Sequence, residues 1–328
     1  MQLEHKFRAP RIRCREIGEA DLEAVADLLA KSPFGRPRDF WTDALQRLGA
    51  HPTPPGYAKY GYVLDVNGIV AGVLLVISTA IGSDHEAGVR CNFSSWYVWP
   101  AFRPYASLLV SVALKHKDAV HTDLSPLEHT RDLIAAQGFR RYCEGRYATF
   151  PLARFGPPYG AKVRAAEPGV EPGPDLSAAE IALLLDHAAY GYVSLLVHWR
   201  GRRYPFVFEP GGPFRFFRSA YLLYARSIAD FIRFARPVAL YLIRHGIFIV
   251  SLDANDRVPG LLGRYREATP KYFKGPAAPA LGDLAYSERA VLGLRFPATV
   301  AAEGPEVGQL SSGAESIAVR SGYPSPPS

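Results

Sequence analysis

The stretch that decides the fold is WYVWPAFRPYASLL, residues 96–109. Its first residues are aromatic and β-branched, which is typical of a strand, and Pro100 ends that strand because proline has no N–H to donate to a sheet. From about Tyr105 to Lys117 the apolar residues then recur with helical spacing. The sequence therefore predicts a strand, a turn and a helix in direct succession.

Further elements are expected on both sides of this unit. Helix caps, apolar periodicity and turn residues place them within the first 150 residues. They are a strand at 11–17, a helix from 21, a helix at 39–49, strands at 60–66 and 69–78 around the Asn67-Gly68 turn, the strand at 90–99, the helix at 105–117, a strand at 119–124, a helix from 126, and a hairpin at 139–152. The predicted order is β-α-α-β-β-β-α-β-α-β-β.

The composition is that of a globular protein. The chain has 328 residues, of which 48% are hydrophobic and 21% charged, enough for about two domains. No apolar run reaches the roughly 18 residues of a transmembrane helix, and the basic N-terminus lacks the apolar core of a signal peptide. We therefore expect a cytoplasmic protein without a transmembrane segment.

The second half of the chain repeats features of the first. Shifting by 130 residues places Tyr60-Gly61-Tyr62-Val63 on Tyr190-Gly191-Tyr192-Val193 and Arg103 on Arg233. A constant offset of this kind predicts a duplicated domain. The expected organisation is a first domain at 1–152, a linker at 153–174, a second domain at 175–298, and a disordered tail rich in Gly, Ser and Pro at 299–328. Within the second domain we expect a long helix at 227–246 and another helix at 259–267.

Residues 11–152 resemble the GNAT superfamily of acyl-CoA-dependent N-acyltransferases. The resemblance rests on REIGEADLEAVADLL at 15–29, on the Asn67-Gly68 hairpin, and on the block at 96–109 followed by AQGF at 136–139. It implies an α/β (α+β) fold with two GNAT-like mixed-sheet domains in tandem, the second one degenerate.

The resemblance also implies where acetyl-CoA or another acyl-CoA binds as co-substrate. The strand backbone at Tyr97 and Val98 would hold the pantetheine arm. The turn would hold the pyrophosphate, because a helix N-terminus offers unpaired N–H groups and a partial positive charge, and Arg103 would add a charge-assisted contact. The residues implied for this turn are Arg103, Tyr105, Ala106 and Ser107.

The turn departs from the family pattern. It lacks the usual glycines, and the tyrosine that commonly reprotonates the departing thiolate falls on Ile134. Two alternatives to an acyl-CoA-dependent enzyme follow. One is a catalytically silent GNAT-like binding or scaffold protein. The other is a Fem-type transferase, which has a similar tandem layout and uses aminoacyl-tRNA as its donor.

Transfer to an amine needs a base, and candidates are carboxylates or imidazoles near the central strands. Glu86 precedes the aromatic strand, and His121 alternates with Asp123 on the next one. We predict Glu86 or His121 as the base and Tyr142, or else Tyr105, as the acid. The same residue types also occur in solvated loops and in packed, half-buried positions.

Other chemistries lack sequence support. Cys14, Cys91 and Cys143 are an odd number without CxxC spacing, so neither a disulfide framework nor a metal site is expected. The sequence also lacks the motifs of P-loop nucleotide hydrolases, zinc proteases and standard serine hydrolases.

The formal net charge of +7 allows a polyanionic partner. Nine arginines and two acids lie between Arg200 and His245, interleaved with aromatic residues, a combination that nucleic-acid-binding proteins use. Arginine is abundant along the whole chain, however, so nucleic acid is not the expected partner, except for tRNA as the alternative donor. The sequence predicts an acyltransferase in which an amine, or a hydroxyl, of a small-molecule or peptide acceptor attacks the thioester directly.

Overall fold

The computed structural model describes residues 11–82, 88–154, 158–214 and 217–294. In these residues twelve strands form one mixed sheet in the order β1-β2-β3-β4-β5-β12-β6-β11-β10-β9-β8-β7. The strands are β1 (Ile12–Glu16), β2 (Gly61–Val66), β3 (Ile69–Ile81), β4 (Gly88–Val98), β5 (Val120–Asp123), β6 (Arg140–Thr149), β7 (Lys162–Ala165), β8 (Val193–Trp199), β9 (Arg202–Phe214), β10 (Phe217–Ala225), β11 (Ile247–Ala254) and β12 (Gly263–Lys274). The predicted α/β class with a mixed sheet is confirmed.

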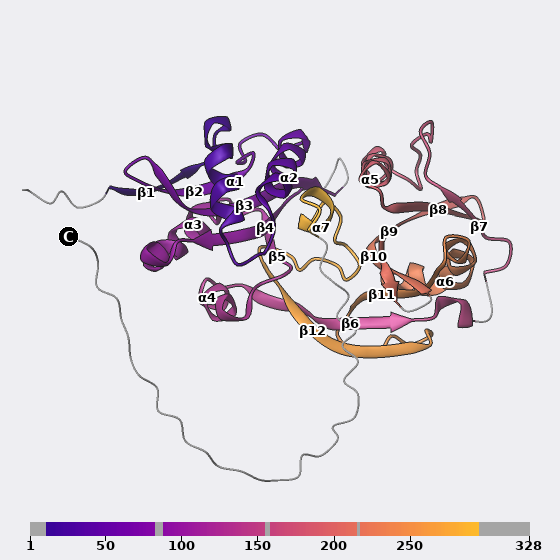
Figure 1. Ribbon diagram of the computed structural model, residues 1–328. Helices are drawn as coiled ribbons and strands as arrows, with labels where there is room; N and C mark the ends of the chain where they lie inside the picture. Colours follow the sequence, from indigo (N-terminus) through magenta and orange to yellow (C-terminus); the bar gives the residue numbers. More distant parts are fainter. Residues whose placement is uncertain (1–10, 83–87, 155–157, 215–216, 295–328) are drawn as a thin grey trace, which may run out of the picture. The chain divides into compact units, whose positions relative to one another are not determined.

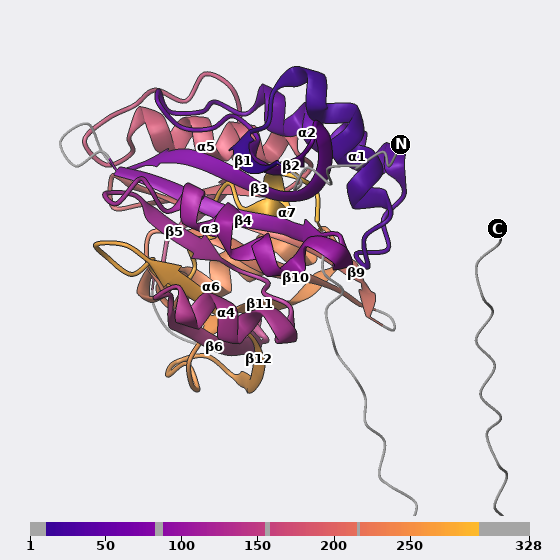
Figure 2. The same ribbon diagram turned by 90° about the vertical axis from the view of Figure 1, so that its left-hand side faces the viewer.

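Seven α-helices accompany the sheet in the described ranges (Figures 1 and 2). They are α1 (Leu22–Ala30), α2 (Arg38–Ala50), α3 (Ala106–Ala113), α4 (Arg131–Ala136), α5 (Ala178–Ala189), α6 (Ile228–Ile243) and α7 (Glu288–Val291). Buried side chains of α1 and α2 pack with one set of β2 and β3 residues, and those of α3 and α4 pack with the alternate set. Because alternate strand residues point to opposite faces, these helix pairs cover opposite faces of the sheet. Helices α5 and α6 pack on alternate residues of β8 and β9 in the same way.

The hairpin between β2 and β3 is as predicted. Val66 pairs with Ile69, and Asn67 and Gly68 between them have φ of 53° and 88°. Two successive positive φ angles are what a tight two-residue hairpin turn requires, and Asn-Gly accepts them at low cost.

Strands β6 and β12 differ from the expectation. The hairpin predicted at 139–152 is wrong, because β6 runs straight through Gly145 and pairs with β11 on one side and β12 on the other. A Cβ at Gly145 would lie 2.4 Å from the Arg266 carbonyl oxygen. This glycine therefore allows close strand approach rather than a turn. The helix predicted at 259–267 is also wrong, since Gly263–Glu267 pairs with β6.

These pairings cross the two halves of the sequence. Strands β1 to β5 are followed in the sheet by β12 from the C-terminal part of the chain, and strands β7 to β11 are followed by β6 from the N-terminal part. Each set contains a single parallel pair, β4–β5 and β10–β11. Two related halves that exchange their last strands would give this order. The division into domains at 152 and 175 stays a prediction, and the predicted tail at 299–328 lies outside the described residues.

The C-terminal segment, defined here as residues 279–294, contains α7 and contacts both sets of strands. Val291 and Leu292 belong to the core under α1 and α2, whereas Leu284 and Ala290 belong to the core under α5. In Figure 1, α7 accordingly lies between β4 and β10. Polar groups buried beneath this segment are thus shared by residues from both halves.

Candidate active site

Strand β4 continues past the end of its neighbour β5. The parallel pairing runs from Arg90–Val120 to Phe93–Asp123 and ends there, while β4 extends to Val98. Just beyond the last pair, the β3–β4 register shifts and Ser95 has a φ of 52°, which marks a bulge. Tyr97 and Val98, predicted to hold the pantetheine arm, lie on this extension without a β5 partner.

The predicted pyrophosphate turn follows β4 directly. It is a 3-10 helix, η2 (Pro100–Tyr105), which runs into α3. Arg103 and Tyr105 are exposed, with 41% of Tyr105 accessible. Ala106 and Ser107 form the first turn of α3, and the Ala106 N–H donates to the Arg103 carbonyl oxygen of η2. The structure therefore brings the predicted donor-binding residues together in one strand–turn–helix unit.

Of the two predicted bases, His121 lies within the described residues. Glu86 lies outside the described residues. The His121 ring is buried against Phe93, with centroids 5.6 Å apart, and its Nε2 lies 3.2 Å from the Ala113 carbonyl oxygen. Burial lowers the pKa of His121, which favours the neutral ring. His121 faces the α3 side of the sheet, because Phe93 and Ala113 belong to that core.

The predicted acid, Tyr142, lies on the face of the C-terminal segment. Its ring contacts Phe273 edge-on at 6.0 Å and packs against Leu284 and Ala285. Its hydroxyl is buried and has no hydrogen-bond partner. Burial raises the pKa of Tyr142 well above its usual value, so the hydroxyl keeps its proton at neutral pH.

A buried polar network occupies the point where β4 and β5 separate. The Glu288 carboxylate, on α7, accepts hydrogen bonds from Asn92 Nδ2 and, at 3.0 Å, from Ser125 Oγ. Thr122 Oγ1 donates to Asn92 Oδ1 at 3.1 Å. Glu288 is 0% exposed, and burial raises its pKa. Asp123 keeps some exposed surface, yet burial and then the nearby Glu288 charge raise its pKa to about 7.

Two more charged clusters extend this network across the sheet. Lys271 Nζ lies 2.6 Å from Asp253 Oδ1, which also accepts a hydrogen bond from the Tyr221 hydroxyl. Arg289, next to Glu288, donates to Glu209 on β9 at 2.6 Å. Buried charges are expensive unless paired, so these pairs hold their partners firmly in place.

A narrow gap, here called the inner gap, is lined by residues of the C-terminal segment together with Asn92 and Thr122. It is too small for a water molecule. The Tyr142 hydroxyl and Ser287 Oγ border it, and both are buried without a partner. Such unsatisfied groups cost about 1–3 kcal/mol each.

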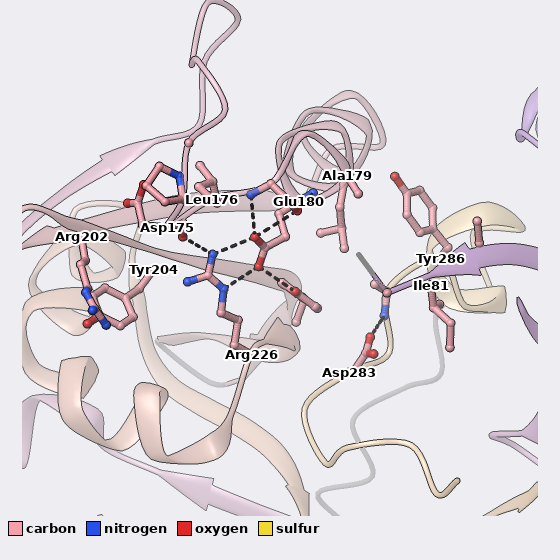
Figure 3. A pocket seen from close by; sticks show the side chains of 18 of the residues that line it. Ile81, Asp175, Leu176, Ala179, Glu180, Arg202, Tyr204, Arg226, Asp283 and Tyr286 are labelled. Carbon is pink, nitrogen blue, oxygen red and sulfur yellow. Dashed lines mark hydrogen bonds and ion pairs between the residues drawn. The ribbon is translucent and has the colours of Figure 1, made fainter. Parts of the chain in front are cut away.

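A larger space, here called the outer cavity, adjoins the inner gap and has a volume of about 900 Å³ (Figure 3). Arg90, Asp283 and Ala285 border both spaces. The cavity is lined by Ala80, Ile81, Gly82, Arg90, Gly173, Pro174, Asp175, Leu176, Ser177, Ala179, Glu180, Leu183, Arg200, Gly201, Arg202, Tyr204, Tyr224, Arg226, Asp283, Ala285 and Tyr286. Both halves of the chain therefore build it.

Known structures share this architecture at low sequence identity. A GCN5-related N-acetyltransferase from Anabaena variabilis superposes with a TM-score of 0.57 at 12% identity, covering 80% of this chain and 72% of that chain. The chain has the GNAT fold. A conserved protein from Enterococcus faecalis gives a TM-score of 0.53 at 8% identity, with coverage of 80% and 72%. The glucosamine N-acetyltransferase region of a fungal multi-domain GH3 β-N-acetylglucosaminidase gives 0.50 at 11% identity, covering 81% of this chain and 38% of that chain.

Sequence comparison adds nothing to the GNAT fold assignment, since no family model and no curated protein matches the sequence. No helix within the described ranges is long and apolar enough to cross a membrane. The same residues contain no group of three or more His, Cys, Asp or Glu side chains arranged to hold a metal ion.

Several residues at the centre of this GNAT fold were not predicted from the sequence. Asn92 and Thr122 look like ordinary strand residues, and Glu288 lies in a short helix almost 200 positions along the chain from Asn92. The available signal was Glu288-Arg289, two charged residues between Ala285 and the apolar pair Val291-Leu292. A charged pair in an apolar stretch indicates buried, partnered charges.

Proposed function

We propose that this protein is an acyltransferase that moves the acyl group of an acyl-CoA to an amine, or a hydroxyl, of a small-molecule or peptide acceptor. One observation carries the proposal: β5 stops pairing at Asp123 while β4 continues to Val98. The unpaired side of β4 offers backbone groups to an extended amide-containing chain, as an added strand would use them. The pantetheine arm has this chemistry. A cytoplasmic location is part of the same proposal.

The diphosphate of the donor would bind at η2 and the start of α3. The partial positive charge at the start of this helical stretch favours an anion, and the exposed Arg103 would supply a charge-assisted hydrogen bond. The turn carries side chains in place of the usual glycines, and that of Tyr105 is 41% exposed.

Glu86, His121 and Tyr142 remain the sequence-based candidates for proton transfer. The geometry adds two carboxyl groups near the point where β4 and β5 separate: Asp123, at the end of the pairing, and Glu288, which is bound to Asn92. In the proposed step, the acceptor nitrogen gives one proton to a carboxylate and its lone pair forms the C–N bond. The C–S bond breaks, the departing thiolate takes a proton from the Tyr142 hydroxyl, and the tyrosinate regains a proton from the carboxylic acid formed in the first step, which leaves a neutral amide and free CoA.

Calorimetry with acetyl-CoA, a long-chain acyl-CoA, free CoA and charged tRNA tests the donor. We expect binding of the CoA compounds and a loss of about 10- to 100-fold in affinity for Arg103→Glu, since a hydrogen bond to a charged group contributes roughly 1.5–3 kcal/mol. Arg264→Glu, at an exposed arginine on β12, is the matched control and should bind normally.

The two alternatives predict different results in the same experiment. Heat with charged tRNA but none with CoA compounds supports a Fem-type donor and refutes the proposal. An unchanged affinity in Arg103→Glu indicates that CoA does not bind at this turn. Binding without turnover of any thioester supports a silent binding protein.

A further inference from the structure

The two sets of strands separate at corresponding places. The offset of 130 residues found in the sequence relates the parallel pair Arg90–Val120 of β4 and β5 to the pair Ala220–Val250 of β10 and β11. Pairing of β10 with β11 ends one residue later, whereas β10 itself continues to Ala225. Residues 223–225, here called the β10 edge, therefore extend beyond the pairing with β11 as the end of β4 extends beyond the pairing with β5.

The C-terminal segment bonds to the β10 edge as a short antiparallel strand would. The Ala225 N–H donates to the Gly282 carbonyl oxygen at 2.9 Å. The Leu284 N–H donates to the Leu223 carbonyl oxygen at 2.7 Å, and the residues between these two bonds form an antiparallel bridge. Because β9 pairs with the other side of β10 as far as Ala225, the segment occupies the side that β11 has left.

The corresponding edge of β4 has no such partner. Strand β3 pairs with one side of β4 up to Val98, and β5 leaves the other side at Phe93. Within the described ranges, no residue outside the strands forms a backbone hydrogen bond with residues 94–98. Unpaired backbone groups at a strand edge can bind an extended chain that carries amides. One of the two corresponding edges is therefore filled by the chain itself, and the other is left for a ligand.

The residues bonded to the β10 edge lead directly to Glu288. Asp283 pairs with Arg90 of β4 at 3.0 Å. Glu288 follows Leu284 by four positions and accepts a hydrogen bond from Asn92 of β4. A segment fixed on the second set of strands thus brings a carboxylate to the place where the first set separates.

Gly282 allows this attachment. Its φ is 83°, an angle that residues with a side chain rarely adopt. A Cβ at this position would lie 2.9 Å from Cδ1 of Ile228, the first residue of α6, whose side chain packs against the core under that helix. Any larger residue here should therefore push the segment away from the β10 edge.

We propose that the second set of strands binds no donor and instead uses its donor-type edge to hold the C-terminal segment, which positions Glu288 for the first set. Gly282 is then a positioning residue, and each chain binds one acyl-CoA. This inference rests on the proposed function, because it takes the free edge of β4 as the donor site and Glu288 as the proton acceptor.

Hydrogen exchange of the wild-type protein, with and without saturating acetyl-CoA, tests which edge binds the donor. We expect acetyl-CoA to slow exchange within residues 94–107 and to leave residues 222–231 and 279–286 unchanged. Calorimetry should give one acetyl-CoA per chain. Two bound molecules per chain, or slower exchange at 222–231 together with faster exchange at 279–286, would mean that the donor displaces the segment, and the inference would be wrong.

A glycine variant tests the positioning of Glu288. In Gly282→Val the segment should shift, so transfer should slow by about tenfold or more and the acid limb of the pH–rate profile should move, while acetyl-CoA affinity stays within about threefold. Gly56→Val is the matched control, because Gly56 has a φ of 82° and no atom within 4 Å of an added Cβ. It should keep the wild-type rate and profile.

The outcomes separate this inference from the donor proposal. A folded Gly282→Val protein with the wild-type rate and profile overturns the positioning role, even where acetyl-CoA binds at residues 94–107. If Gly282→Val does not fold, the exchange pattern and the stoichiometry of the wild-type protein decide whether the inference stands. If no CoA compound binds the wild-type protein at all, the proposed function itself is wrong, and the inference fails with it.

Discussion

Arg90 on β4 and Asp283 of the C-terminal segment form an ion pair, with Nη1 3.0 Å from Oδ2. The Arg90 side chain is 8% exposed and also donates to the Ala285 carbonyl oxygen. Its guanidinium therefore ties the C-terminal segment to the strand that separates from β5. The same pair divides the outer cavity from the inner gap.

Removing Arg90 should destabilise the protein strongly. Arg90→Ala leaves Asp283, whose side chain is 29% exposed, and the Ala285 carbonyl without their partner, and each partly buried polar group left unpaired costs about 1–3 kcal/mol. Urea unfolding followed by circular dichroism measures the change. Arg141→Ala, in the exposed pair with Glu144 at 3.6 Å, is the control and should change the unfolding free energy by less than about 1 kcal/mol. Equal effects of the two substitutions would contradict the structural role of Arg90.

Gly145→Ala should disturb the pairing of β6 with β12. The added Cβ would meet the Arg266 carbonyl oxygen at 2.4 Å, so the strands must separate, and we expect a loss of about 1–3 kcal/mol. At Gly88, on β4, a Cβ would lie 3.6 Å from Ile81, an ordinary contact. Gly88→Ala should therefore leave the urea midpoint nearly unchanged, and an equally stable Gly145→Ala would argue against the β6–β12 register.

Asp123 makes stability depend on pH in a defined window. Its pKa is about 7 in the folded protein and about 3.9 in an unfolded chain, so the folded state binds more protons between these values. The unfolding free energy therefore falls as the pH rises from about 4 to about 7, because the unfolded chain loses the Asp123 proton at lower pH than the folded protein does. Asp123→Asn removes the effect, so its stability relative to wild type should improve by up to about 4 kcal/mol across this window. Parallel pH curves for the two proteins would refute the raised pKa.

Tyr142→Phe should be tolerated by the fold but not by the proposed chemistry. The hydroxyl is buried without a partner, so its removal should leave stability unchanged or raise it by up to about 1 kcal/mol. If Tyr142 protonates the departing thiolate, release of CoA in single-turnover experiments should slow at least tenfold. Unchanged release would remove Tyr142 from the proposed mechanism, whereas a large loss of stability would mean that the hydroxyl has a partner.

Glu288→Gln tests the proposed proton acceptor. The amide fills the same space, so acetyl-CoA affinity should stay within about threefold, while transfer should slow about 10²- to 10⁴-fold. The acid limb of the pH–rate profile should also disappear. Glu288→Asp keeps the carboxylate and should retain that limb. A Glu288→Gln variant with the wild-type rate and pH profile would exclude Glu288 as the proton acceptor and leave Glu86 and His121 as the candidates.

Local features of the fold followed from the sequence. Asn67-Gly68 fixed a hairpin because few other dipeptides accept two positive φ angles. Pro100 follows the end of β4 and the apolar spacing after it produced α3, so the residues predicted to bind the donor lie in one strand–turn–helix unit. Gly145 shows the limit of such reasoning. Glycine favours turns and also close strand approach, and only the neighbouring strand β12 decides between them.

The candidate site was predictable only in its donor half. Tyr97 and Arg103 could be proposed from the sequence because the strand–turn–helix unit is continuous, and their role stays a prediction. Glu288 was missed because its partners, Asn92 and Ser125, lie more than 160 positions away. His121 alternates on its strand as expected, but the packing of Phe93 and α3 placed it on the face opposite the polar network.

The sequence by itself determined the Asn67-Gly68 hairpin and the strand–turn–helix unit, because these depend on backbone angles and periodicity within a few residues. Tertiary structure alone decided that β12 pairs with β5 of the first half, that β6 pairs with β11 of the second half, and that Glu288 lies beside Asn92. Those outcomes depend on apolar surfaces and charges that distant segments bury together, and these segments meet only where the C-terminal segment packs on the sheet.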